Sequence, residues 1–344
     1  MIKCKQVQEL STQEIALPTV STPSTIMVVD DQPLSLLHAV DLVQYQGYKV
    51  VEVNDSRQAL KIAFEEQPDV ILADVVMPEI NGVELTKHLK LEPHTQSIPV
   101  LLMSVTEESQ LRHQALKAGA EDVVLKPLDH TILYPKLKNL AQQKRLNEVL
   151  NQTQKVLLNL ATLIKTKSGY DHQSSFQLAN LVRGFAEHLE LPHSDIEDLV
   201  FAAYLHDIGT VNIPDYIFHK HGALTLEEKQ IIHQHCVIGE QICQPLHNRP
   251  NLLKIIRHHH EKYDGSGYPD GLTMKQIPYL AQVFQLVDIY YALTQNRHYK
   301  TTYTPSSALA ILEEEVIKGW RNPELWEQFK QFIFLQLSSS CLSI

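Results

Sequence analysis

Five short apolar runs alternate with helical segments between residues 25 and 130, and this alternation constrains the fold more than any other feature of the chain. Strands that alternate with helices in this way form a parallel sheet with helices packed on its faces. We therefore predict a doubly wound α/β domain with a five-stranded parallel sheet. The runs are residues 26–29, 50–53, 70–73, 100–103 and 122–125, and the helical segments begin near Pro33, Ser56, Asn81 and Ser109.

The periodicity becomes helical after this domain. Apolar residues recur at three- and four-residue steps between residues 131 and 165, which predicts an amphipathic linker helix with Pro135 near its start. This stripe either packs on a neighbouring domain or forms a homodimeric coiled coil, and fewer than four clean heptads leave both alternatives open. The apolar positions are Leu133, Leu137, Leu140, Leu146, Leu150, Leu157, Leu160 and Ile164.

The rest of the chain completes the predicted organisation. Residues 155–335 carry a helical pattern and are expected to form a second, all-α domain. Residues 1–24 lack a repeating apolar pattern, which predicts a disordered N-terminal tail, and residues 336–344 are expected to be a C-terminal tail.

Composition excludes several classes of function. The net charge of −10 argues against binding of nucleic-acid polymers, because affinity for a phosphate backbone comes from concentrated Lys and Arg. No segment reaches the roughly 18 consecutive apolar residues of a membrane span, and the N-terminus lacks the apolar core of an export signal. The four cysteines, Cys4, Cys236, Cys243 and Cys341, form no close pair. We therefore expect a cytoplasmic protein with reduced thiols and no membrane contact.

Acidic residues follow the predicted strands of the first domain. Asp30 and Asp31 end the first strand, Asp74 ends the third, Ser104 ends the fourth, and Lys126 follows the fifth. The carboxyl ends of parallel strands meet in one crevice, and carboxylates that share a crevice repel one another unless a cation lies between them. Mg²⁺ prefers such carboxylate oxygens together with water. The sequence predicts a magnesium and phosphoryl site.

This constellation resembles the receiver domain of two-component response regulators over residues 25–130. The resemblance implies a flavodoxin-like fold, a phosphoacceptor at Asp74, Mg²⁺ near Asp30 and Asp31, and a sensor histidine kinase as partner. In that family an aromatic residue three positions before the lysine usually swings inward on phosphorylation. Val123 stands there, so a different packing change is expected.

Imidazoles and carboxylates gather in the second half of the chain, above all in residues 258–271. Such ligands suit iron, manganese, nickel or zinc, and the glycines of this stretch let the backbone come close to a ligand. His206 and Asp207 follow an apolar helix, and neighbours on a helix project about 100° apart, so both can reach one metal cluster. We predict a metal site beside a phosphate-sized space.

The second half resembles the HD-GYP domain, a branch of the HD superfamily known as cyclic di-GMP phosphodiesterases. The resemblance implies two divalent transition metals, iron or manganese first and nickel or zinc as alternatives, bridged by Asp207 and a hydroxide. Ser168 replaces the glutamate that holds a third metal in some relatives. The matching blocks are residues 205–209, 213–215, His235 with Gly239, 259–269, 287–288 and 297–300. The implied ligands are His172, His206, Asp207, His235, His259, His260 and Asp288, with His258 and Glu261 in supporting roles.

The resemblance also implies how substrate phosphates are bound. Arg297 and Lys300 match the family's Arg-x-x-Lys phosphate contacts, and Lys220 matches a further family lysine. Thr210 replaces the lysine that closes the His-Asp block, and the loss of such a charge costs about 10²- to 10³-fold in rate if nothing substitutes. Tyr268, in the Gly-Tyr-Pro loop, is expected at the rim of the site or on a docking surface for GGDEF domains.

Together these observations predict a phosphorylation-controlled response regulator that hydrolyses cyclic di-GMP to linear pGpG, with GMP left open as a further product. Asp207, Arg297 and Lys300 are the predicted catalytic groups, and a hydroxide held by the two metals is the nucleophile. Two alternatives remain. The second domain is a catalytically weak or inactive cyclic di-GMP sensor or GGDEF-docking module, or it hydrolyses another cyclic dinucleotide or a phosphomonoester.

Overall fold

The chain divides into two compact units, which meet between Glu148 and Val149. The computed structural model describes residues 23–167, 173–218, 220, 222–295 and 302–341. Helix α5, His130–Lys167, runs across the boundary between the units. No helix in these described ranges is both long enough and apolar enough to cross a membrane.

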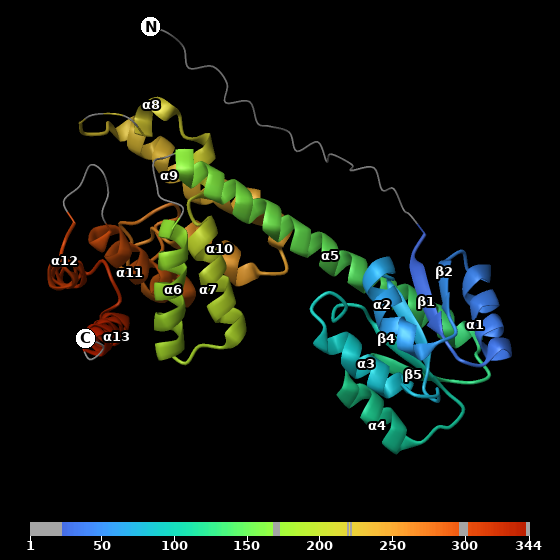
Figure 1. Cartoon of the computed structure of the whole chain (residues 1–344). Coiled ribbons are helices and arrows are strands. Elements are labelled where there is room, and N and C mark those ends of the chain that lie inside the picture. Colours follow the sequence, from blue (N-terminus) through green and yellow to red (C-terminus); the bar gives the residue numbers. More distant parts are fainter. Residues whose placement is uncertain (1–22, 168–172, 219, 221, 296–301, 342–344) are drawn as a thin grey trace, which may run out of the picture. The chain divides into compact units, whose positions relative to one another are not determined.

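The first unit is a five-stranded parallel sheet with helices on both faces (Figure 1). The strand order is β2-β1-β3-β4-β5, and each neighbouring pair is parallel. This confirms the doubly wound α/β fold. The strands are β1 Thr25–Val29, β2 Lys49–Val53, β3 Val70–Asp74, β4 Val100–Ser104 and β5 Asp122–Leu125. The helices before α5 are α1 Pro33–Tyr45, α2 Ser56–Glu66, α3 Gly82–Leu91 and α4 Ser109–Ala118.

Alternating side chains of the strands build one apolar cluster on each face of the sheet. Met27 and Val29 of β1 belong to one cluster, and Ile26 and Val28 belong to the other, as the two-residue period of a strand requires. The second cluster also takes in the buried start of α5, at Leu133, Leu137 and Ala141. The first part of α5 is therefore built into the core of this unit.

Gly82 fixes the position of α3 behind the end of β3. A Cβ at this position would lie 2.3 Å from the carbonyl oxygen of Asp74, so only glycine permits the close approach. The side chain of Asn81 caps the helix by accepting from the backbone N–H of Glu84. The close contact between Gly82 and the Asp74 carbonyl holds the end of β3, and with it Asp74, at a defined place in the crevice.

The regular elements of the second unit are helices, among the residues that the structure describes, which confirms the predicted all-α domain. Its core is one apolar cluster that includes Phe185, Phe284 and Phe329. Helix α13 continues through residues 336–341, which the sequence assigned to a C-terminal tail. The helices are α6 Gln173–His188, α7 His193–Leu205, α8 Asp215–Phe218, α9 Leu226–Cys243, α10 Pro250–His258, α11 Tyr279–Thr294, α12 Pro305–Ile317 and α13 Pro323–Cys341. Short 3-10 segments are η1 Ile208–Asn212, η2 Gln244–Leu246 and η3 Met274–Gln276.

The predicted leucine stripe of the linker is divided between different environments. Leu133 and Leu137 are buried in the first unit, and Leu157 is buried in the second. In contrast, Leu146 is 58% exposed and Leu160 is 45% exposed. The periodic pattern was correct for a helix, but its apolar positions do not form one continuous face.

Candidate functional site

The acidic residues of the first unit lie together at the carboxyl ends of β1 and β3. Asp30 and Asp74 are buried, and the Nζ atom of Lys126 lies 2.7 Å from Asp30 Oδ2 and 2.6 Å from Asp74 Oδ1. Each of Asp30, Asp31 and Asp74 has an oxygen within 4.8 Å of the others. Ser35 donates to Asp30 and accepts from Lys126, which fixes the ammonium between the carboxylates.

The charges of this site fit a cation and an incoming phosphoryl group. Burial raises the pKa of Asp74, Lys126 opposes this effect, and the carboxylate of Asp30 adds to it. The Oδ1 atom of Asp31 is a buried oxygen with no hydrogen-bond donor among the described residues. A buried carboxylate oxygen without a partner is costly, and Mg²⁺ would satisfy it.

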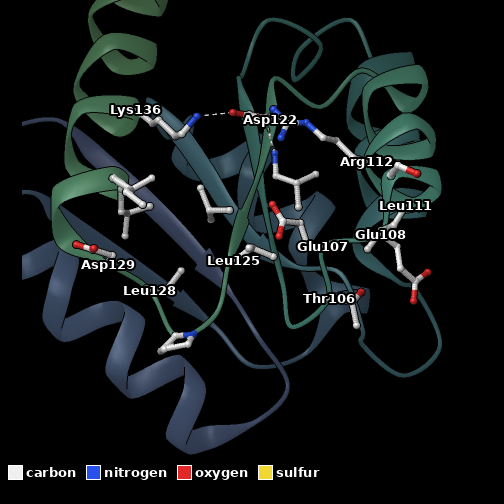
Figure 2. A pocket seen from close by; sticks show the side chains of 16 residues that line it. Thr106, Glu107, Glu108, Leu111, Arg112, Asp122, Leu125, Leu128, Asp129 and Lys136 are labelled. Carbon is white, nitrogen blue, oxygen red and sulfur yellow. Dashed lines mark hydrogen bonds and ion pairs between the residues drawn. The ribbon is translucent and has the colours of Figure 1, made fainter.

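Ser104 ends β4 as predicted, but its hydroxyl donates to the backbone carbonyl of Thr106 at 2.9 Å. Val123 lines a cavity of about 360 Å³ between α4, β5 and the start of α5 (Figure 2). On the wall of this cavity Asp122 pairs with Arg112 and with Lys136. The small side chain of Val123 therefore leaves open space three residues before Lys126, where the receiver family usually has an aromatic residue.

Three buried histidines of the second unit are held in the same way. The Nδ1 atom of His206 donates to the carbonyl of Ala202 at 3.0 Å, that of His235 to Ile232 at 2.6 Å, and that of His259 to Ile256 at 2.8 Å. A carbonyl can only accept, so each Nδ1 carries the proton. Each Nε2 is then left with a lone pair, which is the form that binds a metal.

These Nε2 atoms point to a common centre. The Nε2 atoms of His235 and His259 are 3.4 Å apart. The Nε2 of His206 lies 2.9 Å from Asp207 Oδ2 and 3.8 Å from Asp288 Oδ1, and the Nε2 of His235 lies 3.7 Å from Asp207 Oδ1. Lone pairs and carboxylates that face one another at such distances repel unless a cation lies between them. The donor set therefore fits a divalent metal.

The protonation states point the same way. Burial, with the charge of the neighbouring His235, lowers the pKa of His260 to about 3, and burial holds the pKa of His259 well below its usual range. Burial alone would raise the pKa of Asp207, but His206, whenever its ring is protonated, and the ammonium of Lys165 outweigh this effect and hold the pKa of Asp207 well below its usual range. Neutral imidazoles and an ionised carboxylate are the ligand forms that a metal requires.

Comparison with known proteins agrees with both halves of this description. Residues 26–138 match the response regulator receiver domain, and residues 138–325, more than half of the chain, match the HD domain. The chain is a response regulator with a receiver domain and an HD domain. HD domains bind divalent metals, and receiver domains use Mg²⁺.

Several relatives match this chain over most of their length. The cyclic di-GMP phosphodiesterase response regulator RpfG of Xanthomonas campestris is 31% identical over 312 residues, which cover 83% of this chain and 82% of the relative. A probable cyclic di-GMP phosphodiesterase of Vibrio cholerae is 31% identical, covering 84% and 73%. A cyclic di-GMP phosphodiesterase of Thermotoga maritima is 28% identical, covering 89% of each chain.

We define the HD site as His206, Asp207, His235, His259, His260 and Asp288. The structure brings all six together, from α9, α11 and the segments that follow α7 and α10. Helix α6 begins at Gln173, directly after His172. Three predicted residues, His172, Arg297 and Lys300, lie outside the described residues.

Of the predicted substrate contacts, Tyr268 packs against the HD site, whereas the side chains of Thr210 and Lys220 are engaged by other groups. The hydroxyl of Thr210 donates to the backbone carbonyl of Asp207 at 2.7 Å, so it is already engaged. Lys220 pairs with both carboxylate oxygens of Glu228, and no described contact brings it to the HD site. Tyr268 lies at the site, stacked on the ring of His233 at 3.6 Å between centroids and packed against His260 at 4.8 Å.

Three residues that lie beside the HD site were not predicted from the sequence. His233 covers one face of Tyr268, and Cys236 Sγ lies 3.5 Å from the Nε2 of His235. Burial raises the pKa of the Cys236 thiol above its ordinary value, so the thiol is protonated. The third is Lys165 of α5, whose ammonium acts on Asp207 and Asp288. Nothing in the sequence pattern links α5 to α7, so only the fold could show this residue.

Proposed function

We propose that this response regulator hydrolyses cyclic di-GMP to linear pGpG at the HD site, under the control of phosphorylation at Asp74. The Nε2 atoms of His206 and His235 face Asp207, and the Nε2 atom of His259 lies 3.4 Å from that of His235. This convergence carries the proposal, because such a donor set holds divalent metals. Relatives that cover most of this chain are named for this activity, which supports the choice of substrate.

The residues of the HD site fit two divalent ions, and we propose iron or manganese. When bound, these ions supply Lewis acidity for cleavage of a phosphodiester and activate water at neutral pH. Asp207 is the candidate bridging residue, because one of its oxygens faces His206 and the other faces His235. The neutral imidazoles of His259 and His260 complete the ligand set, together with His172 from the sequence.

The protein's own residues shape the rest of the site. Glu261 is fully buried and accepts from the backbone N–H groups of Asp270 and Leu272, which holds the Gly-Tyr-Pro loop against the HD site. The same loop presses Tyr268 onto His260, so the ring forms a wall. We propose that Arg297 and Lys300 bind the substrate phosphates from the segment that follows α11.

In the receiver domain we propose that a sensor histidine kinase phosphorylates Asp74. Lys126 already contacts Asp74 and Asp30, so its ammonium is in place to pair with the oxygens of a phosphoryl group. Asp30 and Asp31 then remain to hold Mg²⁺.

Turnover tests this proposal. The purified full chain, stripped of metal and reloaded with Mn²⁺ or Fe²⁺, is expected to convert cyclic di-GMP to pGpG, and His206→Ala is expected to convert none. No product with either metal, or equal product from His206→Ala, would contradict the assignment. Competition with other cyclic dinucleotides then measures the substrate preference.

We also propose that the protein pairs with a second copy through α5. Exposed apolar residues recur along this helix in steps of three and four, with Thr153 completing the repeat, which is the a and d spacing of a coiled coil. The flanking residues Leu150, Gln152 and Asn159 carry no charge, so a parallel copy would oppose no like charges. The exposed positions are Leu146, Val149, Val156, Leu160 and Leu163.

Sedimentation of variants tests this pairing. Leu160→Asp would place two like charges opposite each other and is expected to give a monomer, whereas the wild-type chain sediments as a dimer. Asn151→Asp, on an exposed face away from the stripe, is the matched control and should remain dimeric. A monomeric wild-type chain would refute the pairing.

A further inference from the structure

Lys165 is a cation built into the wall of the HD site. Its ammonium donates to the carbonyl of Ala203 at 3.2 Å, while the neighbouring carbonyl of Ala202 accepts from Nδ1 of His206. Ala203 belongs to the last turn of α7, where carbonyls lack donors within the helix and the helix dipole favours positive charge. The contact sets the ammonium just before His206 and Asp207.

The position of Lys165 on α5 is unusual for a charged residue. Leu157 and Ala161 are buried in the core of the HD domain, and Lys165 continues the same helical face by one further turn. Burial lowers the pKa of Lys165, while the carboxylates of Asp207 and Asp288 act in the opposite direction. An ammonium that is partly withdrawn from water costs free energy unless carboxylates or other partners offset it, and Asp207 and Asp288 supply that offset.

The role follows from the charges of the site. Burial keeps the imidazoles of His259 and His260 neutral, and the carboxylates of Asp207 and Asp288 carry the negative charge that attracts a divalent ion. The ammonium of Lys165 offsets part of that charge without leaving the wall of the site. A divalent ion that binds to the carboxylates is therefore repelled by Lys165, and its affinity is lower than the ligands alone would give.

We propose that Lys165 is a positioning residue that sets the divalent-metal affinity of the HD site by acting on Asp207 and Asp288. This inference rests on the proposed metal-dependent function. Without metal, the negative charge of Asp207 and Asp288 needs a counter-ion, and the ammonium of Lys165 provides it. The Lys165 side chain also ties α5 to the last turn of α7, just before two of the metal ligands.

Metal affinity, measured by competition with a chelator on the full chain, tests the inference. Lys165→Met is expected to bind Mn²⁺ about tenfold more tightly than the wild type at low ionic strength, since it lacks the repelling charge. Lys165→Arg keeps the charge and should retain the wild-type affinity. Lys155→Met removes the same charge from an exposed position on the same helix and should also leave the affinity unchanged.

The outcomes separate this inference from the proposed function. If Lys165→Met is folded by circular dichroism and binds Mn²⁺ as the wild type does or more weakly, Lys165 only caps the end of α7. That result would overturn the inference. A wild-type chain that binds no Mn²⁺, or a His235→Ala variant that binds it equally well, would instead overturn the metal site itself. Tighter binding in Lys165→Met alone supports the inference.

Discussion

Gly209→Ala is predicted to disable the HD site although it replaces no metal ligand. Segment η1 crosses α9 at this glycine, where an added Cβ would lie 2.0 Å from the carbonyl oxygen of His235 and 2.5 Å from the amide nitrogen of Gly239. Both atoms belong to the backbone, so neither can rotate away. Carbon and oxygen atoms pack at about 3.5 Å, so η1 and α9 must separate by more than about 1 Å.

This separation moves Asp207, which precedes η1, away from His235 on α9. Loss of groups that orient metal ligands costs about 10- to 100-fold in metal affinity, and a displacement of about 1 Å at a reacting centre costs about 100-fold in rate. The overpacked contact should also destabilise the HD domain by about 1–3 kcal/mol. We expect Mn²⁺ binding at least about tenfold weaker than in the wild type.

Chelator competition and thermal unfolding measure the two effects. Gly184→Ala is the matched control in the same domain, because its added Cβ would meet the ring of Phe332 at 3.2 Å, and a side chain can adjust. The receiver domain should still accept a phosphoryl group from a small-molecule donor in both variants. Wild-type Mn²⁺ affinity in Gly209→Ala would refute the argument that this contact sets the geometry of the HD site.

Three further predictions concern charges. Lys126→Met leaves the carboxylates of the receiver site without a counter-ion, which costs about 3–5 kcal/mol of stability. Mg²⁺ should therefore raise the melting temperature of this variant more than that of the wild type, and an equal rise would contradict the argument. Thr210→Lys should raise turnover of cyclic di-GMP by up to about 10²-fold, whereas unchanged kcat would show that the missing charge is not limiting. Burial would raise the pKa of Asp122, but hydrogen bonds and the charges of Lys136 and Arg112 outweigh it and lower this pKa. The ionised Asp122 carboxylate therefore stabilises the fold above its unfolded-state pKa, and this stabilisation is lost as the pH falls through its folded-state pKa. Acid unfolding of Asp122→Asn should accordingly show less loss of stability below about pH 4 than the wild type.

The sequence predicted those parts of the molecule that depend on local pattern. Alternation of apolar runs and helices gave the parallel sheet, and the carboxyl ends of its strands brought Asp30, Asp31 and Asp74 together with Lys126. For the HD site, the family resemblance named His206, Asp207 and the pair His259–His260, and the structure places these residues at the ends of helices that share one core.

Other features depend on contacts between distant segments and could not be read from the sequence. Lys165 reaches the HD site because α5 packs beside the end of α7, and periodicity carries no information about that contact. The stripe on α5 was predicted as one face, although both ends of α5 enter cores and a different set of residues is exposed. The Ser104 hydroxyl turns to Thr106, a rotamer choice that strand position does not determine.

The central claim is that the HD site is a two-metal centre for hydrolysis of cyclic di-GMP. Its most direct test is a Mn²⁺ titration of the metal-free full chain, with bound metal and initial rate of pGpG formation measured on the same samples. The account predicts about two ions per chain and a rate that rises as they bind, with Asp207→Asn forming no product at any loading. Product from the metal-free chain, or none from the fully loaded wild type, would contradict it.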